Sequence, residues 1–377
     1  MHKHSSSILA YCRPGYENDT ANELATLYAE HSVFGYPVSH SGSGFVHYNL
    51  YDASELNKAL GLFAVTECIF PRQLIGVFAT LNEIEKEDRV GQILDAIKDI
   101  SLSDVTGEHG VFGAIEVEHP DTEDGKTLAK FCRKVTVPLR QALRKKGWLS
   151  AKENNHKPKL HVFFESFLTC YIGVSLAGQR SEHHMGICRL KFPPDAPSRS
   201  TLKLEDALVN MLSATEQQEV LRAGARAVDL GACPGGWTYQ LVKREMYVEA
   251  IDNGAVDDSL MRTGLVEHHS ADGFTYRPQF GRVDLLVCDM IEQPDRVAKL
   301  MGDWLVKHWA SHAVFNLKLP MKRRYETVSG IMSVLMTRLN ALDDVFNVRV
   351  KHLYHDRDEV TVTIIRSSCI GTSYVEV

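Results

Sequence analysis

A glycine-rich turn follows a short apolar strand in the C-terminal half of this 377-residue chain. The strand AVDL ends in Gly231-Ala-Cys-Pro-Gly235-Gly236, and a helix-like stretch, WTYQLVKR, comes next. Glycines at such a turn allow the backbone to approach a ligand closely, because no side chain intervenes. The spacing matches neither the GxGxxG fingerprint of dinucleotide-binding proteins nor the phosphate loop GxxxxGK. The turn therefore predicts a ligand other than a dinucleotide or a nucleoside triphosphate.

Three aspartates occur where neighbouring strands are expected to end. Asp252 follows YVEAI, Asp272 lies in ADGF, and Asp289 follows DLLVC. A single aspartate in such a place is often only a helix cap, but three around one glycine turn favour a nucleoside that carries a positive charge. We expect Asp252 to accept hydrogen bonds from ribose hydroxyls and Asp272 to accept one from an adenine amine. Asp289 is expected near a sulfonium and its polar tail.

The elements that would hold these residues alternate between strands and helices. After the proline-rich stretch 191–200, helical stretches separate the strands ARAVDLGA, MYVEAID, RVDLLVCDM and HAVFNLKL. This alternation predicts a mostly parallel, doubly wound sheet that is covered on both faces and binds its ligand at the carboxyl ends of the strands. The last two strand-like runs, FNVRVKHLYH and EVTVTIIR, are joined by the short turn DRD and predict an antiparallel hairpin at the sheet edge.

The region before residue 191 has mixed α and β character. ILAYC predicts a strand, and Thr20-Ala-Asn-Glu23 predicts a capping box that opens an amphipathic helix. VFGAIEVEH, HVFFE and LTCYIGVSL predict further strands. Between the first two of these, LAKFCRKVTVPLRQALRKKG predicts a pair of helices, the second of which Pro138 opens and Gly147 closes.

A strongly basic segment runs from Lys126 to Lys159, in which eleven side chains are basic and one, Glu153, is acidic. At helical spacing, Arg140 and Arg144 lie on one face. Such a local surplus of positive charge repels itself unless a polyanion is bound, so the segment predicts phosphate binding. The formal net charge of the whole chain, −6, hides this patch.

Composition excludes several classes of protein. The chain is 44% hydrophobic and 24% charged, and no apolar run is long enough to cross a bilayer. The start, MHKHSSS, is polar and the apolar stretch after it is too short for a secretory signal, so we expect a cytoplasmic protein without a membrane partner. The eight cysteines include no CxxC pair, and the side chains of adjacent histidines diverge, so we expect neither disulfides nor a metal.

DLGACPGGWT, the pair Asp272-Gly273 and VCDM are similar to segments of class I methyltransferases of the RrmJ/FtsJ type, which methylate the 2′-hydroxyl of RNA ribose. The resemblance covers roughly residues 195–366 and implies an α/β, Rossmann-like sheet with S-adenosyl-L-methionine as the cofactor. It implies a Lys-Asp-Lys-Glu tetrad, for which the residues of matching context are Lys203, Asp289, Lys318 and Glu359. The implied cofactor contacts are Ser200, Cys233, Pro234, Gly235, Gly236, Asp252, Asp272 and Asp289.

The tetrad suits the reaction that this resemblance implies. A ribose 2′-hydroxyl is a poor nucleophile at neutral pH, so a base must take its proton while the methyl group transfers in line. Lys318 is the expected base. It must release its own proton more readily than a free lysine, which burial and the like charge of Lys203 favour. Asp289 and Glu359 are expected to orient the two ammonium groups, although their negative charges oppose that release.

The basic segment, followed by HVFFE and LTCYIGVSL, resembles a THUMP domain, an RNA-binding module. We therefore expect a ferredoxin-like α/β subdomain over residues 1–84, an α+β THUMP-like domain over residues 85–188 and a methyltransferase domain over residues 189–377. The expected RNA contacts are Arg133, Arg140, Arg144 and Lys145 in the basic segment, and Lys322 and Arg323 after the expected base.

Nearly end to end, the chain resembles a bacterial family that methylates the 2′-hydroxyl of a cytidine in 23S rRNA. The segments FCRKVTVPLR, RLKFPPDAPSRSTLKLE and LYHDRDEVTV carry this likeness. It implies 23S rRNA as the partner, naked or in an early large-subunit particle, and no DNA. One alternative is a THUMP-type enzyme that methylates a tRNA base, but such enzymes share an Asn-Pro-Pro type motif where this chain has CDMIEQP. The other is a non-catalytic rRNA-binding assembly factor, against which the filled tetrad argues.

Overall fold

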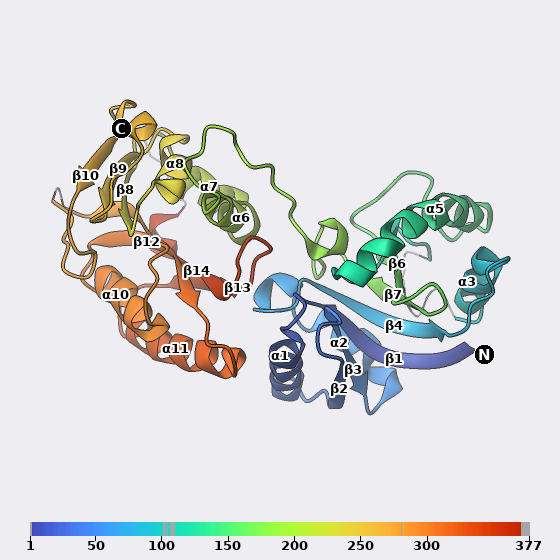
Figure 1. Ribbon diagram of the computed structural model, residues 1–377. Helices are drawn as coiled ribbons and strands as arrows, with labels where there is room; N and C mark the ends of the chain where they lie inside the picture. The colour runs from blue at the N-terminus through green and yellow to red at the C-terminus, as the bar shows by residue number, and fades with distance from the viewer. Residues whose placement is uncertain (1, 101–102, 104, 106–109, 280, 371–377) are drawn as a thin grey trace, which may run out of the picture. The chain divides into compact units, whose positions relative to one another are not determined.

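Two seven-stranded sheets organise the chain, one in each half of the sequence. The computed structural model describes residues 2–100, 103, 105, 110–279 and 281–370, with the backbone alone for residues 2–5. The chain divides into two compact units, Met1–Ile187 and Cys188–Val377, which Figure 1 shows in colours from blue to green and from green to red.

The N-terminal unit is an α+β structure around one continuous sheet of order β2-β3-β1-β4-β7-β6-β5. Its strands are β1 (His2–Tyr11), β2 (Gly35–Ser39), β3 (Phe45–Leu50), β4 (Gln73–Leu81), β5 (Ala114–Glu118), β6 (Lys159–Phe164) and β7 (Cys170–Ser175). Its α-helices are α1 (Glu17–Glu30), α2 (Leu56–Gly61), α3 (Arg89–Lys98) and α5 (Glu123–Lys145). Among the described strands of this unit, β5 and β6 are the one parallel pair. The domain boundary expected after residue 84 falls in the connection between β4 and α3. The strands before and after this connection belong to the same sheet.

The start of α1 differs from the prediction. The helix begins at Glu17, one turn before the expected capping box, and Thr20 and Glu23 lie inside it. The carboxylate of Glu23 accepts hydrogen bonds from the backbone N–H groups of Ile69 and Phe70. The predicted capping box is therefore wrong: the helix begins after Tyr16, which makes no side-chain cap hydrogen bond, and Glu23 instead fixes a segment that is distant along the chain.

The expected pair of helices around Pro138 is also wrong, because α5 continues through the proline as one helix. Its buried side chains keep helical spacing on both sides of Pro138; they are Leu128, Cys132, Val135, Leu139 and Leu143. A proline inside a helix costs roughly 3 kcal/mol, and the apolar stripe along the sheet offsets that cost by burying several large side chains. Pro138 itself is exposed, on the outer side of the helix.

The C-terminal unit confirms the doubly wound sheet. Its strands are β8 (Arg226–Leu230), β9 (Tyr247–Ile251), β10 (Val266–His269), β11 (Val283–Cys288), β12 (Ala310–Lys318), β13 (Phe346–Lys351) and β14 (Glu359–Arg366). The order is β10-β9-β8-β11-β12-β14-β13, with β8 to β12 parallel to one another. The predicted antiparallel hairpin is present, and its second strand, β14, pairs with β12 so that β13 forms the edge.

Helices cover both faces of the C-terminal sheet. They are α6 (Thr201–Met211), α7 (Ala214–Val220), α8 (Gly236–Val242), α9 (Asp258–Met261), α10 (Pro294–Val306) and α11 (Arg324–Leu339). Figure 1 shows α10 and α11 on one face and α6 to α8 on the other. The buried residues Leu204 and Leu208 of α6 join Leu285 and Val314 of the sheet in one core cluster. Among the described helices, none combines the length and the apolar character that crossing a membrane requires.

Candidate active site

The register of the parallel strands brings three of the predicted segments to one edge. Leu230, Ile251 and Cys288 are the last residues of β8, β9 and β11, and they lie side by side in the sheet. The glycine turn follows Leu230, Asp252 follows Ile251, and Asp289 follows Cys288. Their gathering therefore comes directly from the pairing of the strands, as the carboxyl-end rule requires.

The glycine turn is closely packed against the segment that leads into α6. Gly235 has φ 114°, a left-handed conformation that favours glycine. A Cβ on Gly236 would lie 2.1 Å from Ser200 Oγ, so only glycine fits there without movement. Trp237 Nε1 donates to the carbonyl of Ser200 at 3.1 Å. The predicted residues Ser200, Gly235 and Gly236 are thus close together.

The acids of this edge suit a ligand rich in donors and positive charge. Asp252 accepts backbone hydrogen bonds from Cys233 at 3.0 Å and Gly254 at 2.8 Å, which fix its carboxylate against the turn. Asp272 is exposed and accepts from the N–H of Phe274. Each carboxylate oxygen has capacity for further donors. The hydroxyl and amine groups of S-adenosylmethionine can donate hydrogen bonds to these carboxylates, and its positively charged sulfonium is compatible with their negative charge.

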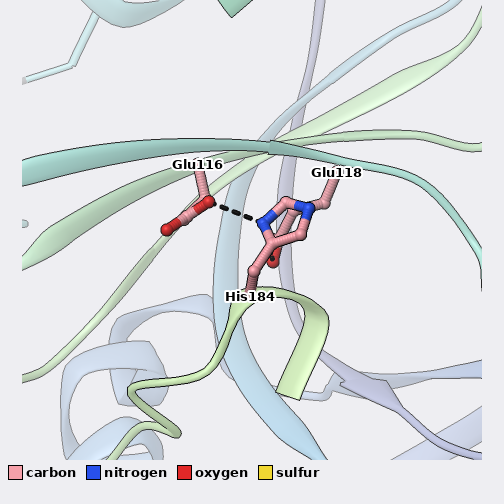
Figure 2. Close-up of side chains that lie close together, drawn as sticks. All are labelled: Glu116, Glu118 and His184. Atoms are coloured by element: carbon pink, nitrogen blue, oxygen red, sulfur yellow. Dashed lines mark hydrogen bonds and ion pairs between the residues drawn. The ribbon is translucent and has the colours of Figure 1, made fainter. Parts of the chain in front are cut away.

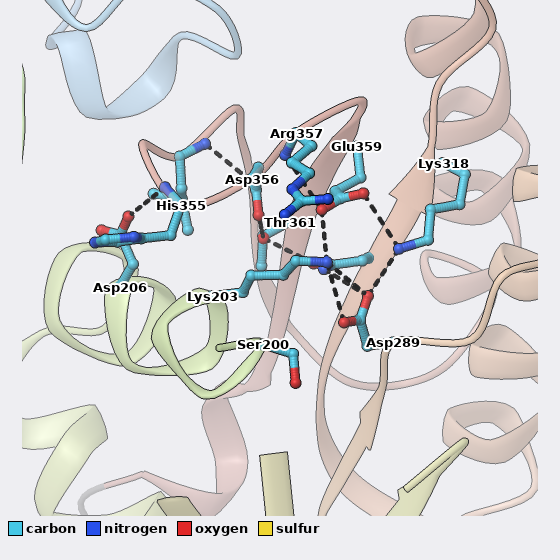
Figure 3. Close-up of polar contacts among 12 residues, drawn as sticks. Ser200, Lys203, Asp206, Asp289, Lys318, His355, Asp356, Arg357, Glu359 and Thr361 are labelled. Atoms are coloured by element: carbon cyan, nitrogen blue, oxygen red, sulfur yellow. Dashed lines mark hydrogen bonds and ion pairs between the residues drawn. The ribbon is translucent and has the colours of Figure 1, made fainter. Parts of the chain in front are cut away.

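The structure brings the four residues of the predicted tetrad into one closed ring of ion pairs (Figure 3). Lys203 Nζ lies 3.1 Å from Asp289 Oδ2 and 2.6 Å from Glu359 Oε1. Lys318 Nζ lies 2.8 Å from Asp289 Oδ1 and 3.2 Å from Glu359 Oε2. Each ammonium therefore contacts both carboxylates. The residues come from α6, the end of β11, the end of β12 and the start of β14.

The ring carries balanced charge in a largely buried place. Burial alone would lower the pKa of Lys203, but the charge of Asp289 and the hydrogen bond to Glu359 outweigh it, so this pKa is raised. Burial alone would raise the pKa of Glu359, yet the hydrogen bond from Lys203 and the charge of Lys318 lower it. Lys203 thus holds its proton firmly and Glu359 remains a carboxylate at neutral pH.

Asn316 belongs to this site although the sequence analysis did not single it out. Its amide donates to Asp289 Oδ1 at 2.9 Å and accepts from the Thr361 hydroxyl at 2.8 Å. The side chain is completely buried. In the sequence it is a polar residue directly after the apolar run AVF and two positions before Lys318, and this spacing places both on the same face of the strand.

The predicted RNA-binding residues have different surroundings. Arg133, Arg144 and Lys145 are exposed on α5, and Arg140 is half-buried on the same helix. Lys322 and Arg323 are exposed in the connection between β12 and α11. Their contacts with RNA remain predictions.

The end of the basic segment departs from the expected surface. Lys159 is buried on β6, and its ammonium lies 3.6 Å from Glu116 Oε1. It therefore adds no charge to a phosphate-binding surface. The sequence showed its charge but not its partner, which is distant along the chain.

A cluster in the N-terminal unit was also absent from the sequence analysis. Potential ligand atoms of Glu116, Glu118 and His184 lie within 4.8 Å of one another (Figure 2). However, Glu118 Oε2 accepts from Tyr11 and His161, and its Oε1 accepts from the N–H of Met185. Both oxygens are thus occupied by the protein's own donors. His184 is far away in the sequence, so spacing could not reveal the cluster.

Comparison with protein families first gives the class. Residues 196–367 match the model of FtsJ-like methyltransferases, so the C-terminal unit is a class I methyltransferase and S-adenosylmethionine is its cofactor. Residues 5–75 match the RlmM ferredoxin-like domain, and residues 88–176 match the N-terminal model of ribosomal RNA large subunit methyltransferase M.

Individual relatives then give the family. The chain is 72% identical to ribosomal RNA large subunit methyltransferase M of Alteromonas mediterranea over 96% of this chain and 98% of that one. It is 49% identical to the protein of the same name from Psychromonas ingrahamii, over 95% of both chains. The chain belongs to the ribosomal RNA large subunit methyltransferase M family.

Proposed function

We propose that this enzyme transfers the methyl group of S-adenosylmethionine to the 2′-hydroxyl of a cytidine in 23S rRNA, in the cytoplasm where that RNA is made. The observation that carries the proposal is the closed ring of Lys203, Asp289, Lys318 and Glu359 at the carboxyl edge of the sheet. The names of the relatives support large-subunit rRNA as the substrate class. The cytidine rests on the resemblance given above.

Lys318 is the proposed base. S-adenosylmethionine supplies an electrophilic methyl group on a positively charged sulfur. As the ribose oxygen forms its bond to that carbon and the carbon–sulfur bond breaks, the hydroxyl proton moves to Lys318 Nζ, which must be neutral at that moment. The two ammonium groups and the two carboxylates of the ring have no net charge. When the positively charged sulfonium of S-adenosylmethionine binds beside Asp289, the site gains a positive charge, which favours the loss of one proton from an ammonium group of the ring. The raised pKa of Lys203 keeps that lysine charged, so Lys318 is proposed as the residue that accepts the hydroxyl proton.

The cofactor is proposed to lie along the carboxyl edge of β8, β9 and β11. The turn residues Cys233, Pro234, Gly235 and Gly236, together with Ser200, would hold its methionine part through close backbone approach. Asp252 would accept from the ribose hydroxyls and Asp272 from the adenine amine. Asp289 would lie between the cofactor and the base.

Asp252→Ala is expected to raise the Kd for S-adenosylmethionine about 10- to 100-fold, because a charge-assisted hydrogen bond to the ribose is lost. Asp252→Asn retains one acceptor and should have a smaller effect. Isothermal titration calorimetry measures both. Asp258→Ala, an exposed aspartate on α9, is the matched control. Equal affinity in Asp252→Ala and Asp258→Ala would remove Asp252 from the cofactor site.

RNA is proposed to bind along α5 of the N-terminal unit and at Lys322 and Arg323 of the C-terminal unit. Within this proposal, residues 1–84 and 85–188 form the ferredoxin-like and THUMP-like parts, and residues 189–377 form the methyltransferase. The exposed positions of Arg133, Arg144 and Lys145 on one helix support the first surface, since phosphate contacts by basic side chains dominate affinity for RNA.

Changing Arg140 and Arg144 together to glutamate is expected to weaken RNA binding and to reduce the slope of log affinity against log salt by about 1 to 2. Affinity for S-adenosylmethionine should not change. Fluorescence anisotropy with an rRNA fragment at several salt concentrations gives the slope. Lys299→Glu with Lys307→Glu, an equal charge change at exposed residues of the other unit, should leave the slope as it is.

The experiment that tests the function is methyl transfer from labelled S-adenosylmethionine into large-subunit rRNA that lacks the modification, followed by mapping of ribose methylation. A 2′-O-methyl cytidine in 23S rRNA would support the proposal. A methylated base would instead favour the alternative enzyme class, whose Asn-Pro-Pro type motif is replaced here by CDMIEQP. Naked 23S rRNA and an early particle, offered in parallel, distinguish the two forms of substrate. The non-catalytic alternative does not fit a chain that belongs to a methyltransferase family.

A further inference from the structure

The two most exposed large apolar side chains of the described residues both lie beside the tetrad. Ile291 is 92% exposed and Met321 is 90% exposed, whereas the next, Tyr51, is 72% exposed. Ile291 comes two residues after Asp289, and Met321 comes three residues after Lys318. Because Asp289 Oδ1 and Lys318 Nζ are 2.8 Å apart, the two connections leave the same part of the sheet edge.

Other isoleucine and methionine side chains of this unit are buried, unlike those of Ile291 and Met321. Met301, Ile364 and Ile365 are buried in its core. Single exposed apolar residues are ordinary on a protein surface, but two that exceed all others and flank one reaction site indicate a ligand with apolar faces. S-adenosylmethionine is proposed to lie along the carboxyl edge of β8, β9 and β11, with Asp289 between it and the base, so the residues that follow Asp289 and Lys318 are left for the acceptor.

The neighbouring charges fit a nucleic acid. Lys322 and Arg323 follow Met321 directly and are exposed. A nucleotide presents an apolar base face and an anionic phosphate, and the Met321–Arg323 segment presents an apolar tip and two cations. Glu292, next to Ile291, is paired with Arg296 at 2.7 Å, which reduces its repulsion of a phosphate.

The recessed position of the base explains why such residues are needed. The side chain of Lys318 is 21% exposed, and its ammonium is held between two carboxylates. A hydroxyl must enter this recess, which a nucleotide stacked between its neighbours does poorly. Enzymes that do chemistry on a base take the target nucleotide out of the stack, and proteins that open a base step insert apolar side chains into it. The same device would bring a ribose hydroxyl into this recess.

We propose that Ile291 and Met321 are positioning residues that contact the faces of bases at the acceptor step and hold the acceptor nucleotide unstacked, while Lys322 and Arg323 contact its phosphates. The inference rests on the proposed function, because it takes an RNA ribose as the methyl acceptor. The two side chains contact the bases only when RNA binds, so both are exposed to solvent in the free protein.

The test uses an rRNA fragment with a fluorescent base analogue, pyrrolocytidine for a cytidine, at the mapped acceptor position. Its fluorescence rises when the base is unstacked. The full-length Lys318→Ala protein, which binds without turnover, should raise the fluorescence at saturation. Adding Ile291→Ser and Met321→Ser should abolish that rise, whereas Ile291→Leu with Met321→Leu should retain it. Val345→Ser, a change at another exposed apolar residue, is the matched control and should retain it.

The same changes in the otherwise wild-type enzyme give a kinetic readout. The double serine variant should lose at least about tenfold in kcat with an unchanged Kd for S-adenosylmethionine, because unstacking precedes the reaction. Equal fluorescence and equal kcat in the serine and leucine variants would overturn the inference, as would an equal loss in Val345→Ser. If the wild-type enzyme methylates a base instead of a ribose, the proposed function is wrong. The fluorescence measurements would still show whether Ile291 and Met321 hold the nucleotide unstacked, so the two failures can be distinguished.

Discussion

Lys318→Ala is expected to lower the rate constant of methyl transfer by about 10²- to 10⁴-fold, the range that general-base catalysis contributes. The cause is the loss of the nitrogen that receives the hydroxyl proton. Single-turnover transfer into unmodified large-subunit rRNA measures the rate constant. Calorimetry with S-adenosylmethionine should give nearly the wild-type Kd, because the base is proposed to contact the acceptor rather than the cofactor.

Two further variants sharpen that result. Lys318→Arg keeps a positive charge and can form ion pairs with Asp289 and Glu359, but a guanidinium does not deprotonate in proteins, so it should be as inactive as alanine. Lys299→Ala removes an exposed lysine that is paired with Asp303 and should have full activity. If Lys318→Arg transfers methyl groups at the wild-type rate, Lys318 contributes charge alone and is not the base.

Glu118→Gln is expected to destabilise the N-terminal unit by about 3 kcal/mol, because the buried carboxylate accepts hydrogen bonds from Tyr11, His161 and the N–H of Met185, and the amide nitrogen of glutamine accepts none. Burial alone would raise the pKa of Glu118, but the charge of His161 and hydrogen bonds from His161 and Tyr11 lower it to about 2. A carboxyl group with a lowered pKa in the folded state stabilises the protein above its ordinary value of 4.5. That contribution decreases progressively as the pH falls from 4.5 to about 2, so a large part of it is already lost at pH 3.

Hydrogen exchange of the β5 and β6 amides between pH 5 and pH 3, corrected for the intrinsic rate, measures this contribution within one unit of the chain. The wild-type protein should lose local stability on acidification, and Glu118→Gln should be less stable at pH 5 and should change less with pH. Glu123→Gln, a change at an exposed acid, is the control. A wild-type protein whose stability did not change over this pH range would contradict the assigned role of Glu118, which Figure 2 shows beside His184.

The sequence was most informative where residue order alone determines position. Asp252 and Asp289 follow apolar strands, and parallel strands align their carboxyl ends, so their gathering at one edge needs no knowledge of side-chain packing. The hairpin of β13 and β14 was similarly predictable from two alternating runs, but β13 ends at Lys351 and the connection covers residues 352–358 instead of the short turn DRD. The tetrad itself came from the family resemblance, and the structure adds the distances within it.

Tertiary partners explain what the sequence could not predict. Glu23 has the right spacing for a capping box, but its carboxylate accepts hydrogen bonds from the backbone N–H groups of Ile69 and Phe70. Pro138 should end a helix, but burial of the stripe through Leu139 carries α5 past it. Asn316 contacts Asp289 and Thr361, and this connection exists only after three strands have paired. In each case the deciding group lies far away along the chain.

The position of β14 has a consequence for the making of the protein. Glu359 opens this strand, which is the last of the described chain but pairs between β12 and β13 in the sheet. Lys203, Asp289 and Lys318 are therefore synthesised before Glu359, the second of the two acids that contact both lysines. During translation, β12 has an open edge and the two lysines have only Asp289 between them. A nascent chain consequently has no complete tetrad until β14 has left the ribosome, and a stop codon before residue 359 would give a protein that has the cofactor turn but lacks Glu359.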